Sequence, residues 1–386
     1  MTRPQRGYLY KAYGAWHLRF REDVWQPNGT TGRVQVSQRI ASLVECPRKS
    51  DAMRLADEIM YRVNNDLTSP FSTMPMVSFV EEVYLQHVES QNRASTLKGY
   101  RDIWRNHIKP RVGEMRVRDF RTWDGEKLLK RIAEESSLSR ASLKHVKSVL
   151  SAIFKHAKRS GAINGVNPVQ DVSIPKARES EDTHAYSPEE IFRMLKLFPD
   201  PAATVMATAA FTGLRKGELR GLRWENYKEA EIQVTLSVWN SHVSDPKTRS
   251  SKAPVPVISL LQKFLERHRA AVGSPQSGWM FAASNGRPLH LDNLVRREIR
   301  PVLEKAGIEW HGWHAFRRGL ATNLQSLGVP IKTAQAILRH SDYGVTANYY
   351  VKTVDKDVVE AMGLVENACN ERAMEAFASS SAPVVN

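Results

Sequence analysis

Two stretches rich in proline and small polar residues constrain the fold of this chain most, because each separates segments of different hydrophobic periodicity. They are Leu67–Pro75 and Pro175–Asp182. The second is soon followed by Ser187-Pro188-Glu189-Glu190, in which the serine at the N-cap, the proline at the first helical position and Glu190 form a capping box. A chain of 386 residues is also too long for one ordinary core. We therefore predict folded domains at residues 1–66, 77–175 and 187–364, linkers at 67–76 and 176–186, and a C-terminal tail at 365–386.

The hydrophobic periodicity differs between the predicted domains. Residues 8–44 alternate in a way that predicts a small three-stranded sheet, and a helix is expected to follow from Ser50 to about Asn65. The second domain has helical spacing throughout, with one helix predicted to end at Pro110 and another at Ser139–Ser160. In the third domain, helices flank strands predicted at residues 231–238 and 253–258, which a basic loop joins. We expect a multidomain protein that is mainly α with small β-sheets.

The charge balance favours a polyanionic partner. The chain has 56 Lys and Arg against 41 Asp and Glu, a formal net charge of +15, and such an excess is typical of proteins that bind nucleic acid. The predicted Ser139–Ser160 helix carries several lysines that fit phosphate contacts as well as simple solvation. A basic protein with no nucleic-acid role remains the alternative.

The two cysteines, Cys46 and Cys369, are far apart and have no metal-binding spacing. We therefore expect neither a disulfide framework nor a zinc site, and we place the protein in a reducing cytoplasm. The N-terminal residues lack the apolar core of a signal peptide, and no run approaches the roughly 18 apolar residues that indicate a membrane span. We expect no membrane association.

Residues 314–350 concentrate side chains that can hold a phosphodiester and attack it. His314 and Arg317 are three residues apart and therefore share one face of a predicted helix. His340 follows, and the segment ends in the pair Tyr349 and Tyr350. Spacing alone leaves open whether His314 and Arg317 bind an anion or begin a partly buried helix.

Zinc is the other chemistry that this segment suggests, because His311 and His314 also lie three residues apart. No third ligand accompanies them at a catalytic spacing. We therefore expect no metal and no other cofactor.

An upstream turn supplies a further arginine. Gly213 permits a tight turn from which Arg215 can project, and Glu218 lies one helical turn later, where it can orient that arginine.

Together these segments resemble the tyrosine recombinases, or phage integrases. The resemblance rests on three boxes in the family's order: Thr-Gly-Leu-Arg-x-x-Glu-Leu at residues 212–219, His-x-x-Arg at 314–317, and Leu-x-His at 338–340 followed nine residues later by Tyr349. It implies an enzyme that cuts and rejoins DNA through a 3′-phosphotyrosyl intermediate. It also implies that Lys247 is the loop lysine of the family, with Lys252 as the alternative.

The resemblance and the chemistry of the side chains assign a role to each residue. Tyr349 is the expected nucleophile, with Tyr350 as the alternative. Arg215, Arg317 and His340 are expected to donate hydrogen bonds to the phosphate, His314 to accept the tyrosine proton, and Lys247 to protonate the leaving 5′ oxygen.

Two features depart from the family pattern: Tyr350 stands beside the expected nucleophile, and the third box contains an unusual residue at position 339. Arg339 stands where the family usually has glycine. It either adds a cation near the phosphate or points to solvent.

The resemblance also extends to the domains and partners. Residues 77–175 are similar to the family's helical core-binding domain, residues 187–364 to its α+β catalytic domain, and residues 1–66 to an arm-type DNA-binding domain. It implies double-stranded recombination sites as partners, a homo-tetramer on DNA that integrates or excises a mobile element, and accessory DNA-bending or directionality proteins. A type IB topoisomerase-like enzyme and a non-catalytic DNA-binding regulator are the alternatives.

Overall fold

The computed structural model describes residues 4–26, 30–64, 69–181, 183–228, 230–246 and 248–350. The chain divides into two compact units between Glu181 and Asp182. The C-terminal tail predicted at residues 365–386 lies outside the described residues. No helix in the described ranges is long and apolar enough to span a membrane.

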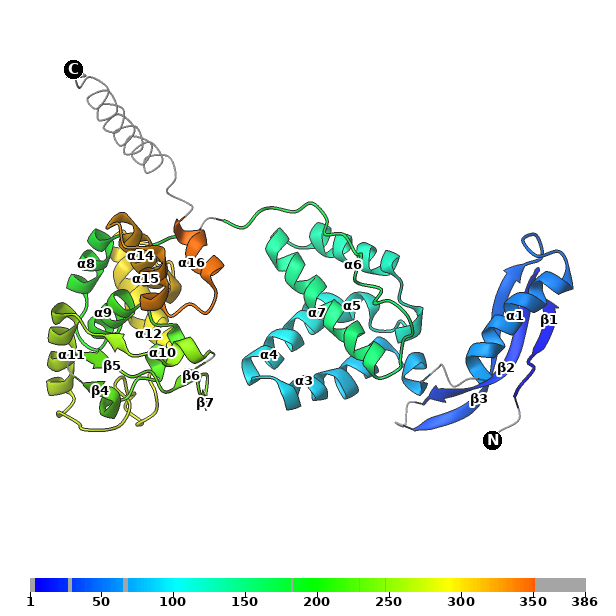
Figure 1. Cartoon of the computed structure of the whole chain (residues 1–386), viewed down its shortest axis with the longest axis horizontal. Helices are drawn as coiled ribbons and strands as arrows, with labels where there is room; N and C mark the ends of the chain where they lie inside the picture. The colour runs from blue at the N-terminus through cyan, green and yellow to red at the C-terminus, as the bar shows by residue number, and fades with distance from the viewer. Residues whose placement is uncertain are drawn as a thin grey trace, which may run out of the picture. The chain divides into compact units, whose positions relative to one another are not determined.

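The first unit begins with an antiparallel sheet in the order β1-β2-β3, with helix α1 beside it (Figure 1). Its elements are β1 Tyr8–Ala12, β2 Ala15–Trp25, β3 Thr31–Ser42 and α1 Lys49–Asn64. Leu18 and Phe20 of β2 are buried with Ala56 and Met60 of α1. Because alternate residues of β2 point to the same face, the alternation of apolar residues determines which face α1 covers. The predicted three-stranded sheet with one helix is confirmed.

The helical part of the first unit packs around α7. Its elements are α2 Met76–Ser78, π-helical η2 Phe79–Tyr84, α3 Leu85–Gln91, α4 Ala94–Ile103, π-helical η3 Trp104–Ile108, α5 Lys109–Val112, the 3₁₀ turn η4 Val117–Asp119, α6 Thr122–Glu135 and α7 Arg140–Arg159. Ser139 caps α7, and one face of α7 is buried as its sequence predicted. The helix expected to end at Pro110 instead continues through η3 into α5, because the π-helical turn just before the proline already departs from the hydrogen-bond pattern that proline would break.

The described part of the predicted first linker, residues 69–76, is packed rather than extended. Its 3₁₀ turn η1 covers Pro70–Thr73, and Met74 and Met76 are completely buried in the helical core. Thr73 Oγ1 accepts a hydrogen bond from the backbone N–H of Trp25 in β2 (3.1 Å). Glu22 of β2, which is also buried, forms an ion pair with Arg118 of η4. The sheet is therefore attached directly to the helices.

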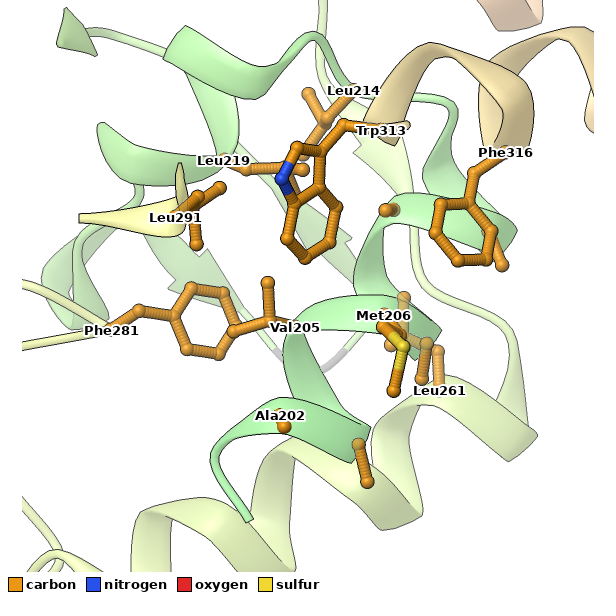
Figure 2. Close-up of a cluster of buried hydrophobic side chains, with 14 of the residues drawn as sticks. Ala202, Val205, Met206, Leu214, Leu219, Leu261, Phe281, Leu291, Trp313 and Phe316 are labelled. Atoms are coloured by element: carbon orange, nitrogen blue, oxygen red, sulfur yellow. The ribbon is translucent and has the colours of Figure 1, made fainter. Parts of the chain in front are cut away.

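The second unit surrounds the almost wholly buried helix α9. Its elements are α8 Pro188–Leu197, α9 Ala202–Thr212, α10 Lys216–Arg220, η5 Trp224–Asn226, β4 Tyr227–Lys228, β5 Glu231–Ile232, β6 Ser237–Trp239, β7 His242–Ser244, η6 Arg249–Lys252, β8 Val255–Pro256, α11 Ser259–Ala271, α12 Leu291–Leu294, π-helical η7 Val295–Ile299, α13 Arg300–Lys305, α14 Trp313–Ser326, α15 Ile331–Leu338 and α16 Tyr343–Tyr350. Val205 and Met206 of α9 lie in a cluster with Leu261 of α11 and Phe316 of α14 (Figure 2). The core therefore fixes α9, which ends just before Gly213, and α14, which carries His314 and Arg317.

The strands predicted at residues 231–238 and 253–258 are broken into shorter pieces. β5 pairs with β4 and β8, whereas β6 and β7 form a separate hairpin. Asn240 adopts a left-handed conformation (φ 50°) and reverses the chain immediately after β6. The basic loop is therefore not the tip of this hairpin but a second loop between β7 and β8.

The segment that enters the second unit lies against α14. The Tyr186 N–H donates to the carbonyl of Ala315 (3.3 Å), and the Tyr186 hydroxyl accepts from the N–H of His311 (2.7 Å). A Cβ atom on Gly319 would stand 2.3 Å from the Tyr186 carbonyl oxygen, so only glycine permits this approach. The entry segment and α14 are therefore held together by backbone contacts.

The ion pair between the sheet and the helices of the first unit yields a stability prediction. Arg118→Met leaves the buried Glu22 carboxylate unpaired and is expected to destabilise the first unit by roughly 2 kcal/mol. Urea denaturation of the full chain, with hydrogen exchange read in β2, measures this change. Arg131→Met is the matched control, because it removes an exposed pair with Glu135 (3.4 Å) and should cost about 0.5 kcal/mol or less. Equal effects would contradict the prediction.

Candidate active site

Arg215 is held at the start of α10 by a carboxylate and a hydroxyl. Gly213 ends α9 in a left-handed conformation (φ 61°) and turns the chain so that Arg215 becomes the N-cap of α10. Arg215 Nη1 donates to Glu218 Oε1 (2.8 Å) and to Ser251 Oγ (2.9 Å). Its side chain remains 30% exposed, whereas that of Glu218 is 3% exposed. The predicted orientation of Arg215 by Glu218 is present, and part of the guanidinium faces solvent.

Arg317 is a buried connection between distant segments of the second unit. It projects from α14, and its Nη1 donates to the carbonyl of Gly213 (2.6 Å). Nη2 donates to the carbonyl of Leu338 at the end of α15, and Nε donates to His340 Nε2 (3.2 Å). One side chain therefore joins α14 to the turn before Arg215 and to the segment that contains His340.

The hydrogen bonds of His340 determine its tautomer. Arg317 Nε can only donate, so His340 Nε2 must accept, and the ring proton lies on Nδ1. Nδ1 is 2.9 Å from Thr346 Oγ1 in α16, to which it therefore donates. Burial lowers the pKa of His340 to about 4, assisted by the charges of Arg317 and Arg215. The imidazole is neutral at pH 7 and, in this arrangement, Nε2 receives a hydrogen bond rather than offering one.

His314 lies in the first turn of α14 and keeps access to solvent. The protein packed around it lowers the pKa of its imidazole, and Arg317, Arg318 and Arg215 add to that shift. His314 is therefore neutral near pH 7, the state that a proton acceptor requires.

Arg339 is buried, which excludes the solvent-facing alternative. It ends α15 in the left-handed conformation (φ 56°, ψ 42°) that usually favours glycine. Its Nη2 donates to Glu218 Oε2 (2.8 Å) and its Nη1 to the carbonyl of Ser251 (2.8 Å), with 1% of the side chain exposed. Burial alone would raise the pKa of Glu218, but Arg339 and Arg215 lower it below its usual value. Glu218 is therefore an ionised carboxylate between two arginines.

The loop between β7 and β8 contains both lysine candidates. Lys247 lies outside the described residues. Lys252, the alternative, forms an exposed ion pair with Asp245 (2.6 Å). Ser251 is completely buried and contacts Arg215. The described part of this loop is therefore fixed beside Arg215.

Helix α16 carries both tyrosine candidates. The side chains of Tyr349 and Tyr350 lie outside the described part of the structure. Thr346 of the same helix accepts a hydrogen bond from His340, which joins α16 to the segment that contains the histidine.

The ring of His311 stacks on His184 of the entry segment, with centroids 3.9 Å apart. Among the described residues, no group of three His, Cys, Asp or Glu side chains could hold a metal ion.

Three contacts were missed by the sequence analysis: those of Ser251, Thr346 and Arg339. Thr346 could have been noticed, because it lies one helical turn before the predicted nucleophile. Nothing in the local sequence of Ser251 or Arg339 indicates that they meet Arg215 and Glu218.

Comparison with known proteins agrees with this geometry. Residues 187–356 match the Phage integrase family, and residues 77–132 match the N-terminal SAM-like domain of phage integrases. This chain belongs to the tyrosine recombinase family. The predicted family is confirmed, and the protein is a site-specific tyrosine recombinase.

Curated tyrosine recombinases match along most of their length. A XerC-like tyrosine recombinase of Caldanaerobacter subterraneus is 23% identical over 367 residues, which cover 86% of this chain and 93% of the relative. An integrase of Streptomyces ambofaciens is 24% identical over 381 residues, 93% of this chain and 97% of the relative.

Solved structures of the family share the fold. A Tn1549 transposon integrase in complex with a circular intermediate DNA has a TM-score of 0.62 at 20% identity, covering 75% of this chain and 98% of the integrase. A lambda integrase dimer bound to a core site has a TM-score of 0.58 at 17% identity, covering 89% and 94%. The predicted fold class, mainly α with small sheets and an α+β catalytic part, is confirmed.

The hydrogen bond from His340 to Thr346 can be tested without DNA. Thr346→Val removes the acceptor of the Nδ1 proton, so we expect the Nδ1 resonance to shift as this hydrogen bond is lost, while Arg317 still keeps the proton on Nδ1. Nitrogen-15 chemical shifts of the imidazole report which nitrogen is protonated. Thr346→Ser keeps a hydroxyl and serves as the control, with the wild-type shifts retained. A Val variant with unchanged nitrogen shifts would contradict the assignment.

Proposed function

We propose that this recombinase cuts and rejoins DNA at specific sites through Tyr349, with Arg215, Lys247, His314, Arg317 and His340 as its other catalytic residues. The observation that carries the proposal is the set of hydrogen bonds made by Arg317. They link the turn before Arg215 with the segment that contains His340, although these parts are more than a hundred residues apart in sequence. Arg215, which is partly exposed, lies close enough to His314 for its charge to help lower the pKa of that histidine.

The proposed cleavage transfers a phosphoryl group to tyrosine. The Tyr349 oxygen forms a bond to phosphorus as the bond from phosphorus to the 5′ oxygen breaks. His314 takes the tyrosine proton, and Lys247 gives a proton to the leaving 5′ oxygen. Arg215 and Arg317 stabilise the charge that develops on the nonbridging oxygens. The 3′-phosphotyrosyl bond keeps the energy of the phosphodiester, so a 5′ hydroxyl from another duplex can reverse the step without ATP or a metal ion.

The hydrogen bonds of the described structure require a local change when DNA binds. Arg317 donates hydrogen bonds to two backbone carbonyls and to His340, whose Nε2 is the acceptor. A phosphate that enters beside Arg215 offers oxygens that compete for these donors and favour a charged His340, because an anion raises the pKa of a nearby imidazole.

The proposed partners are double-stranded recombination sites bound by a homo-tetramer. The net charge of +15 suits this partner. Two similar proteins have been solved with DNA, a lambda integrase tetramer on a Holliday junction and the Tn1549 integrase on a circular intermediate. We propose the same class of assembly here, with accessory DNA-bending or directionality proteins that set integration against excision of a mobile element.

The proposed division of labour follows the predicted domains. Residues 1–66 are assigned to arm-type DNA sites, residues 77–175 to the core site and residues 187–364 to catalysis. The two family matches begin at residues 77 and 187, which supports these boundaries.

The nucleophile is tested with a nicked DNA substrate that traps the covalent adduct. Tyr349→Phe is expected to abolish the adduct, because no hydroxyl remains to attack phosphorus, whereas Tyr350→Phe should retain it. Denaturing electrophoresis and sequencing of the trapped DNA identify the attachment and its polarity. An adduct that survives Tyr349→Phe and disappears in Tyr350→Phe would transfer the role to Tyr350. Plasmid relaxation without exchanged strands would indicate a topoisomerase instead.

Arg215→Ala tests the role of the partly exposed arginine. We expect a loss of at least about a hundredfold in the single-turnover rate of adduct formation, or about 2.7 kcal/mol of transition-state stabilisation. DNA affinity should change little, because the proposed contact strengthens as charge develops on the phosphate. Arg193→Ala, at an exposed position on α8, is the control. Equal losses of rate and affinity would show that Arg215 only anchors DNA.

A further inference from the structure

Arg339 adopts a backbone conformation that is unfavourable for an arginine. A left-handed conformation is sterically unfavourable for a residue other than glycine. Among the described residues, Tyr13, Asn240, Ser274 and Arg339 are the non-glycine residues with positive φ, and Arg339 is the buried member of that set. Its side chain must therefore make interactions that offset both the backbone conformation and the desolvation of a guanidinium.

The contacts of Arg339 join three segments of the site. The guanidinium donates to Glu218 of α10 and to the backbone carbonyl of Ser251 in η6. The backbone carbonyl of Arg339 accepts from Ser250 Oγ (3.4 Å), also in η6. The next residue, His340, binds Arg317. α10, η6 and the segment after α15 are thus connected through one residue.

We propose that Arg339 is a positioning residue for Arg215: it holds Glu218 and the η6 turn in place, so that Arg215 is oriented before DNA arrives. This inference rests on the proposed function of Arg215. With 1% of its side chain exposed, Arg339 cannot itself meet a phosphate in this arrangement. It acts through the carboxylate of Glu218, which accepts a hydrogen bond from each of the two arginines and has no donor to offer a phosphate.

Charge provides a second reason for an arginine at this position. Arg215 and Glu218 alone form a pair with no net charge, which stabilises added negative charge weakly. Arg339 adds one positive charge, so the two arginines and one carboxylate have a net charge of +1. Because the cluster is largely shielded from water, this charge acts most strongly on the extra negative charge that develops on the phosphate during the reaction. Glycine at the same position would leave the pair neutral.

The alternative is that Arg339 only stabilises the second unit. Arg220 offers a matched control for that role. It is also a buried arginine, and it lies in α10 next to Glu218, but it donates only to the backbone carbonyls of Leu289, Val238 and Asn240. Arg220→Met therefore removes buried hydrogen bonds from the same region without touching the carboxylate.

The test uses the full chain and a nicked DNA substrate, with Arg339→Gly as the main variant. Glycine removes the side chain and is at ease in the left-handed conformation, so loss of the backbone strain partly offsets loss of the contacts. We expect the rate of adduct formation to fall about tenfold or more while DNA affinity stays within about twofold. Arg339→Lys keeps the charge but cannot span both acceptors, so its rate should lie between wild type and Arg339→Gly.

A double-mutant cycle separates positioning from general stability. If Arg339 acts through Glu218, Arg339→Gly should add little to the rate loss caused by Glu218→Gln. The rate losses caused by Arg220→Met and by Glu218→Gln should instead multiply. An unchanged rate in Arg339→Gly, or losses that multiply as they do in the control, would overturn the inference.

Hydrogen exchange gives a readout that does not depend on catalysis. The amides of Ser251 and Ala253 donate to the carbonyls of Thr248 and Ser250 within η6. Their exchange should accelerate in Arg339→Gly and stay near wild type in Arg220→Met. Equal exchange in wild type and Arg339→Gly would refute the positioning role. Absence of any adduct with the wild-type protein would instead refute the proposed function and leave this second readout to decide on Arg339.

Discussion

The second unit depends on the buried guanidinium of Arg317. Its donors bind the carbonyls of Gly213 and Leu338 and the ring of His340. The carbonyls belong to the ends of α9 and α15, and Arg317 of α14 contacts both. A buried arginine without such partners is strongly destabilising, so burial of Arg317 requires that these segments have come together.

A second set of charges extends this arrangement. Glu218 accepts from Arg215 and Arg339, and Ser251 accepts from both arginines through its hydroxyl and its carbonyl. The carboxylate is held ionised although it is buried, because both arginines lower its pKa. The guanidinium groups of Arg215 and Arg339 are thus kept close together by one anion.

Local spacing predicted the parts of the site that lie on one helix. Arg215 with Glu218, and His314 with Arg317, are each three residues apart, so helical geometry alone brings them together. The contact between Glu218 and Arg339 spans 121 residues and follows from tertiary packing, for which a single sequence has no signal.

Elsewhere the local signals competed. The prolines near residue 70 predicted a connector, but Met74 and Met76 bury their side chains in the helical core, and burial of apolar surface outweighed the extended tendency.

The backbone contacts of Tyr186 have a mechanical consequence. The N–H of Tyr186 donates to Ala315 of α14, its hydroxyl accepts from His311 just before that helix, and Gly319 has no side chain to keep the two backbones apart. The same helix carries Arg317. A force applied to the chain just before Tyr186 would therefore be transmitted directly to α14, the helix that carries Arg317.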